Sequence, residues 1–352
     1  PIAEKLPNKN VVGEYYFDLA LLREAEEKYE EAYDILHKRV KARRSSNEAE
    51  EDAVLPLAEG ALARICMKLN KLDESYELFK GALGKLNKVI ADSPHSLRLF
   101  SDYAELLVLR GEHLEAIKIY ERIYDKIKGT ALSDHPLAII GSVSYIHAQL
   151  AVGSYEKAYK LSEENIDSFS GRFSRNARAT HGDNFPEQRL MRKSIERNIQ
   201  LFLDSRYPPQ KQGSLSPLDS TFRLAQLVRY LSSADAVAKM SARFSANNKE
   251  LYEIIRLRES EVNQWRALEK TISGSMSGIV KNKMPVELSS FEEQISRLEK
   301  SIQKIDETIL AKYPEYFDLT RARSLRVKEA QELLSHDEVL VVFLLGGEKT
   351  FV

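Results

Sequence analysis

The stretch ARICMKLNKLDES, Ala63–Ser75, decides the fold of this chain. It runs from one small residue to another twelve positions later, and it passes through Asn70, a residue type that favours the left-handed turn after a helix. The same arrangement recurs around YEEA (Tyr29–Ala32), HLEA (His113–Ala116) and YEKA (Tyr155–Ala158). Successive segments, LDES included, begin 43, 41 and 42 residues apart. This regular period predicts a structural repeat.

Each repeat is predicted to be a pair of antiparallel helices. Residues that end helices stand two places before the last three segments, at Asn70, Gly111 and Gly153. The apolar residues that follow a turn recur at helical spacing, as in Tyr76, Phe79, Leu83 and Leu86. Alanine dominates the position twelve residues before the second small residue, which lets the two helices approach closely: Ala20, Ala63, Ala104 and Ile146.

This pattern resembles the tetratricopeptide repeat (TPR) family. Two features differ from that family: the period is near 42 residues instead of about 34, and the aromatic residue at the end of the first helix is absent. A helical solenoid of another type is the alternative. In both cases residues 1–170 are expected to form about four stacked helix pairs, a superhelix in which neighbouring pairs bury each other's apolar faces.

The resemblance implies that the first helix of each pair lines a groove for a protein or peptide partner. The side chains that would then face the groove are Arg64, Lys68, Arg98, Glu105 and His147. The alternative is that these residues are ordinary polar surface residues.

Residues 171–217 interrupt the period and are expected to hold one extra helix, Glu187–Asp204, and a linker rich in Pro, Gly and Ser. This region carries a basic patch: Arg172, Arg175, Arg178, Arg189, Arg192, Lys193 and Arg197. The patch predicts either binding of an acidic peptide or nucleic acid, or a solvated helix face with internal ion pairs. Nucleic acid is the less favoured partner, because 52 Lys and Arg residues balance 53 Asp and Glu residues over the chain.

Residues 218–311 read as a helical block that contains a long antiparallel hairpin. Two segments have the heptad pattern of a coiled coil, one from Leu251 to Ile272 and one from Phe291 to Ile309. The second segment opens with the capping box Ser290–Glu293, and the Gly- and Ser-rich stretch 273–290 is expected to be a loop. Dimerisation through these heptads is the alternative to a hairpin within the chain.

The last forty residues change character. A short helix is expected over Ser324–Leu334, and Glu338–Leu345 (EVLVVFLL) reads as a β-strand. Gly346 and Gly347 would form a hairpin turn into a second strand, Lys349–Val352. Because two strands do not make an independently stable sheet, residues 312–352 are expected to begin a domain that continues beyond them.

Two stretches resemble bacterial TPR proteins with a C-terminal caspase-like CHAT domain. Thr221–Trp265 is similar to the helical region before that domain, with an AQ…MxxR pattern at Ala225, Gln226, Met240 and Arg243. Tyr313–Val352 looks like the entry of the domain itself. The resemblance implies a parent cysteine peptidase whose His and Cys lie beyond Val352, so this chain would be the interaction part and not itself an enzyme.

The rest of the sequence favours a mostly α protein without a catalytic site of its own. Cys66 lies among apolar residues on a predicted helix and is expected to be a buried hydrophobic residue. The seven histidines are scattered, so neither metal ligands nor a cofactor site is expected. No apolar run is long enough for a membrane span. A cytoplasmic location is expected, or a bacterial periplasmic one if a signal peptide preceded Pro1.

Overall fold

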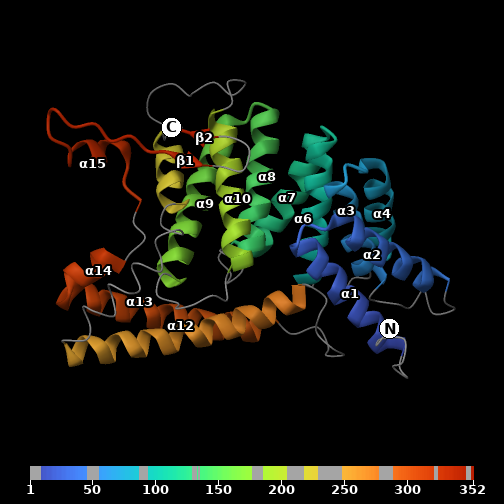
Figure 1. Cartoon of the computed structure of the whole chain (residues 1–352), viewed down its shortest axis with the longest axis horizontal. Helices are drawn as coiled ribbons and strands as arrows, with labels where there is room; N and C mark the ends of the chain where they lie inside the picture. Colours follow the sequence, from blue (N-terminus) through green and yellow to red (C-terminus); the bar gives the residue numbers. More distant parts are fainter. Residues whose placement is uncertain are drawn as a thin grey trace. The chain divides into compact units, whose positions relative to one another are not determined.

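The computed structural model describes residues 9–45, 55–86, 94–128, 133, 135–176, 185–203, 218–228, 248–276, 288–320, 324–345 and 350–352. These described residues are mostly helical, with a two-stranded sheet near the C-terminus (Figure 1). The chain divides into two compact units, Pro1–Asp125 with Glu269–Glu287, and Lys126–Leu268 with Leu288–Val352. Each unit contains its own hydrophobic core.

The repeat region consists of antiparallel helix pairs. In the first unit these are α1 (Lys9–Ala25) with α2 (Tyr29–Arg44), α3 (Leu55–Lys68) with α4 (Leu72–Gly84), and α6 (Pro94–Leu109) with α7 (His113–Ile127), the last two residues of which fall in the second unit. The second unit begins with the pair α8 (Pro136–Ala151) and α9 (Tyr155–Asn176). The second helix of every pair starts at the residue where the repeat pattern placed it.

The turns within the pairs share one geometry. Asn70 has a φ of 57°, and Gly111 and Gly153 both have a φ of 80°. In each case the next residue donates its N–H to a carbonyl five residues back, as Lys71 does to Cys66 at 2.8 Å. Such bonds satisfy carbonyl groups that the helix end leaves free. The first pair turns in the same way at Glu27, with a φ of 61°, a position that the sequence pattern did not identify.

The small residues lie where the helices of a pair meet. All eight predicted contact positions are fully buried at 0% exposure: Ala20, Ala32, Ala63, Ser75, Ala104, Ala116, Ile146 and Ala158. Ser75 is tolerated there because its hydroxyl donates a 2.8 Å hydrogen bond to the carbonyl of Ala63. The predicted antiparallel helix pairs are therefore confirmed.

The second unit adds α10 (Phe185–Leu203), a helix over residues 218–228, and the long helices α12 (Lys249–Met276) and α13 (Leu288–Lys312). The segment of α12 in this unit pairs antiparallel with α13. Arg258, which interrupts the predicted heptad seam, is accommodated because Asp306 accepts hydrogen bonds from its Nε at 2.6 Å and its Nη2 at 3.0 Å. The predicted hairpin is thereby confirmed.

Several boundaries differ from the prediction, and α10 runs over Phe185–Leu203 instead of Glu187–Asp204. α9 continues to Asn176, past the expected end of the repeats at residue 170, and α12 continues to Met276, into the expected loop. α13 begins at Leu288, before the expected cap at Ser290. Ser, Asn and Gly cost a helix at most about 1 kcal/mol each, so a helix that is already packed can extend through them.

The C-terminal region contains the short helices α14 (Pro314–Thr320) and α15 (Val327–Gln331) and the strands β1 (Leu344–Leu345) and β2 (Thr350–Phe351). β1 and β2 are antiparallel, with Leu344 opposite Phe351. The predicted hairpin is present, but the strand predicted over 338–345 is paired only in its last two residues. The part before Leu344 lacks a neighbouring strand among the described residues, and Val339 is 83% exposed.

The expected helix over 324–334 is also shorter in the structure, because residues 324–326 are not helical and α15 ends at Gln331. Several predicted features lie outside the described residues: the linker after residue 203, Met240, Arg243 and the turn residues Gly346 and Gly347. Among the helices of the described residues, none has the length and hydropathy needed to cross a membrane.

Candidate functional site

The candidate site lies on the first helices of three successive pairs in the first unit. We call it the first-helix surface and define it by Glu24 on α1, Arg64 and Lys68 on α3, and Arg98 and Asp102 on α6. Arg64 and Asp102 stand next to or near the buried alanines Ala63 and Ala104. The close packing of the helices at those alanines therefore also sets the spacing of the charged side chains.

Arg64 joins the three helices. It holds Glu24 with two hydrogen bonds, Nε to Oε1 at 2.7 Å and Nη2 to Oε2 at 2.8 Å. On the other side, Nη1 donates to Asp102 Oδ2 at 3.0 Å. The side chain of Arg64 is only 10% exposed, so these ion pairs are largely shielded from solvent.

This network changes the pKa values of its members. Burial acts to raise the pKa of Glu24, but the positive charge and hydrogen bonds of Arg64 outweigh it and lower that pKa to about 2. For Arg64, burial acts to lower the pKa, and the two carboxylates outweigh it and raise the pKa above its usual value. Both groups are therefore ionised throughout the physiological pH range.

Arg98 is held less well than Arg64. Its Nε lies 3.7 Å from Asp102 Oδ2, too far for a hydrogen bond, and this atom is buried without a hydrogen-bond partner. Burial, followed by repulsion from Arg64, lowers the pKa of Arg98. Lys68 is exposed nearby and contributes to the field that lowers the pKa of Glu24. The surface thus contains one cation that is incompletely neutralised.

The structure brings together three of the five residues predicted to face a groove: Arg64, Lys68 and Arg98. Glu105 lies on α6, half-buried, and has partners of its own. His147 lies on α8 in the second unit. Sequence reasoning missed Glu24 and Asp102. A search for opposite charges near the small residue of each first helix would have found Asp102, two places before Ala104.

The basic patch is partly used by internal contacts. Arg172 is 1% exposed and its guanidinium lies 5.5 Å from the centre of the Trp265 ring. Arg192 donates to Glu196 at 2.9 Å and to the carbonyl of Leu345 at 2.6 Å. The other described members also have partners: Lys193 and Arg197. The side chains of Arg175 and Arg189, and the whole of Arg178, lie outside the described residues.

Cys66 is fully buried, as predicted, and burial raises the pKa of its thiol to about 12. A thiol in this state is neutral at pH 7 and is a poor nucleophile. In the part of the chain that the structure describes, no group of three or more His, Cys, Asp or Glu residues is placed to hold a metal ion.

Neither a protein-family model nor a curated protein sequence matches the chain. Among solved structures, it is similar to a putative kinesin light chain from Podosopora anserina with nearly identical TPR-like repeats. A variant form of that protein matches with 17% identity and a TM-score of 0.43, and the match covers 62% of this chain and 93% of the other. A second structure of that protein matches with 16% identity and a TM-score of 0.42, covering 62% and 94%.

Proposed function

We propose that this chain is a protein-interaction scaffold, and that its first-helix surface binds a partner segment through a carboxylate at Arg98 and Lys68. The observation that carries this proposal is the incomplete pairing of Arg98: its buried Nε has no hydrogen-bond partner, while its side chain is 24% exposed and can be reached by a ligand. A buried donor that is left unpaired costs free energy. A carboxylate that pairs with the exposed part of the Arg98 guanidinium offsets part of that cost.

The surroundings favour a carboxylate as the acceptor. Repulsion between Arg98 and Arg64 contributes to the lowered pKa of Arg98, and an added negative charge would offset that repulsion. The network of Glu24, Arg64 and Asp102 fixes the three helices, so the surface loses little conformational entropy when a partner binds. Lys68 is exposed and supplies a second cation within the same surface.

Arrays of short acidic and neutral peptides, probed with the full chain, test this function. We expect binding to a subset of acidic peptides, and we expect Arg98→Ala and Lys68→Glu each to weaken it by about tenfold or more, the equivalent of one lost charge-assisted hydrogen bond. The matched control is Lys118→Glu on α7, whose exposed side chain pairs with Glu115 at 2.8 Å. Equal binding by wild type and both surface variants would contradict the proposal.

We propose further that the scaffold serves a caspase-like CHAT domain. The support is the resemblance of Thr221–Trp265 and Tyr313–Val352, together with the contact between these stretches: the Gln226 side chain bonds to the backbone of Leu325. Sequencing the encoding gene past the codon for Val352 tests the assignment. A caspase-like His and Cys are expected there, and a stop codon directly after Val352 would refute it.

A further inference from the structure

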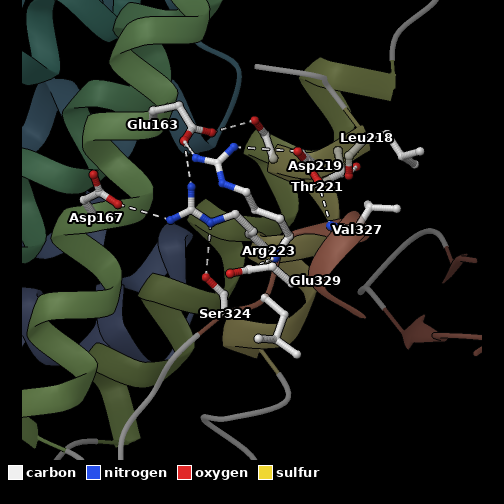
Figure 2. Close-up of polar contacts among 12 residues, drawn as sticks. Glu163, Asp167, Leu218, Asp219, Thr221, Arg223, Ser324, Val327 and Glu329 are labelled. Carbon is white, nitrogen blue, oxygen red and sulfur yellow. Dashed lines mark hydrogen bonds and ion pairs between the residues drawn. The ribbon is translucent and has the colours of Figure 1, made fainter. Parts of the chain in front are cut away.

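A second polar site lies in the second unit, where residues 324–327 make polar contacts with the helix over 218–228 and with Glu163 of α9 (Figure 2). We call residues 324–327 the strap, and we call the surface that holds them the strap site. The strap site is formed by Glu163 and Asp167 on α9 and by Asp219, Arg223 and Gln226 on the helix over 218–228.

Gln226 binds the strap through its backbone. Its Nε2 donates to the carbonyl of Leu325 at 2.8 Å, and the N–H of Leu325 donates to its Oε1 at 2.9 Å. One side-chain amide thus imitates the paired hydrogen bonds that a neighbouring β-strand would offer. The backbone at Arg326 is extended, with φ −72° and ψ 158°. This contact recognises an extended chain and does not depend on the Leu325 side chain.

The flanking residues of the strap are also held by polar groups. Asp219 Oδ1 accepts the N–H of Val327 at 2.8 Å, and Arg223 Nε donates to the hydroxyl of Ser324 at 3.3 Å. The guanidinium of Arg326 lies 3.7 Å from Asp219 Oδ2 and 3.9 Å from Glu163 Oε2. Each residue of the strap therefore has at least one polar contact with the site.

The net negative charge of the strap site favours a strap that carries a basic residue. Glu163, Asp167 and Asp219 supply three negative charges, and Arg223 supplies one positive charge, so without the strap the site carries a formal charge of −2. Arg223 itself is fixed by Glu163 at 2.6 Å and by Asp167 at 3.2 Å. Arg326 reduces the excess negative charge and stays 46% exposed, so its contacts are accessible to exchange.

We propose that the strap site is a peptide-binding site that holds the chain's own residues 324–327, and that an extended partner segment with a basic residue at the position of Arg326 can replace them. Polar contacts hold the strap, and none of its four residues is fully buried. Its replacement therefore exposes little apolar surface. The site is separate from the first-helix surface, so either proposal can fail without the other.

A labelled peptide with the sequence of Ser324–Gln331, SLRVKEAQ, is the probe for this site. The receptor is the full chain with Leu325→Pro and Arg326→Glu, changes that remove the N–H bonded to Gln226 and the strap's basic charge. Fluorescence anisotropy should show that this vacated chain binds the peptide about tenfold more tightly than wild type does, because the wild-type site is already occupied. A peptide with glutamate in place of the arginine should not bind.

Adding Gln226→Ala to the vacated chain should weaken peptide binding by about tenfold, since two hydrogen bonds are lost. The matched control is Gln303→Ala on α13, where the exposed amide donates to Glu307 at 3.0 Å; it should leave binding unchanged. Failure of the peptide to bind the vacated chain, with helix content retained by circular dichroism, would overturn the proposal, and so would binding that ignores Gln226→Ala.

Hydrogen exchange on the wild-type chain gives an independent readout if the vacated chain does not fold. With excess peptide, the amides of Leu325 and Val327 in the chain should exchange faster, because the peptide displaces the residues that protect them. Unchanged exchange at these two amides under saturating peptide would refute the proposal.

Discussion

Within the first-helix surface, Arg64 has a structural role: it connects three helices through ion pairs. It is held by two carboxylates from two other helices, and its pKa is raised because both are ionised beside it. Arg98 lies one turn before Asp102 on α6. Its Nε is 3.7 Å from the same Asp102 oxygen that accepts a 3.0 Å hydrogen bond from Arg64. The two arginines therefore have different roles, and substitutions at them should affect different properties.

Arg64→Met should destabilise the first unit by about 3–5 kcal/mol, because it leaves Glu24 and Asp102 as buried carboxylates without their cation. The measurement is urea unfolding followed by far-ultraviolet circular dichroism. The control is Arg297→Ala, which removes an exposed pair with Glu293 at 3.3 Å and 75% and 77% exposure, and which should cost less than about 0.5 kcal/mol. Equal effects of the two substitutions would show that the network contributes nothing.

The pH dependence of stability should reveal Glu24. Its folded-state pKa of about 2 lies below the usual value of 4.5, so its contribution is fully present above pH 5 and is lost as pH falls from 5 toward 2. From the shift, this contribution is roughly 3 kcal/mol. In Glu24→Gln, the unfolding free energy should fall less steeply with pH over this range. Parallel curves for the two proteins would count against the assigned pKa.

At the scale of elements, the turns between the helices of each pair depend on backbone conformation more than on side-chain contacts. Four turns adopt positive φ with the same hydrogen bonds, although three different residue types occupy this position: Glu27, Asn70, Gly111 and Gly153. An added Cβ at Gly111 would meet no atom within 4 Å. Any cost of substitution there comes from the left-handed backbone alone.

Two glycines separate these effects. Gly111→Ala should destabilise the chain by about 1 kcal/mol, because L-residues disfavour positive φ. Gly81→Ala within α4, where a Cβ also meets nothing within 4 Å, should stabilise it by about 0.5–1 kcal/mol. Both are measured as shifts of the urea midpoint. Effects of the same sign would mean that helix propensity, and not turn geometry, governs position 111.

At the scale of the whole molecule, each of the two units has its own core. The core of the first unit runs from Phe17 to Leu106, and the second unit has clusters around Ile166 and Ile309. Trp265, the single tryptophan, is 1% exposed within the second unit. Its fluorescence therefore reports on that unit, whereas circular dichroism reports on both.

This placement predicts a difference between the two signals. In Arg64→Met, the unfolding transition seen by circular dichroism should split or broaden, because only the first unit is destabilised. The transition of Trp265 fluorescence should keep its wild-type midpoint. A shift of both signals by the same amount would indicate that the units unfold as one cooperative body.

The sequence by itself determined the helix pairs. Their period, their turns and their contact positions follow from local rules: Gly or Asn where φ is positive, a small residue where two helices touch, and apolar residues at helical spacing. The buried state of Cys66 followed in the same way, from its apolar neighbours on one helix. Local preferences were also sufficient for the position of the short β-hairpin, though not for its length.

Only the tertiary structure decided which charges meet. Arg64 lies 40 residues from Glu24 and 38 from Asp102 along the chain, and Gln226 lies 99 residues from Leu325. The sequence contains no periodic pattern that identifies such pairs, because a charged residue on a helix surface has the same sequence context whether it faces water or a partner. The partners of Arg64 and the contacts of the strap site depend on how whole helices pack. Tertiary structure also determines how much of the predicted strand 338–345 is paired with a neighbouring strand among the described residues.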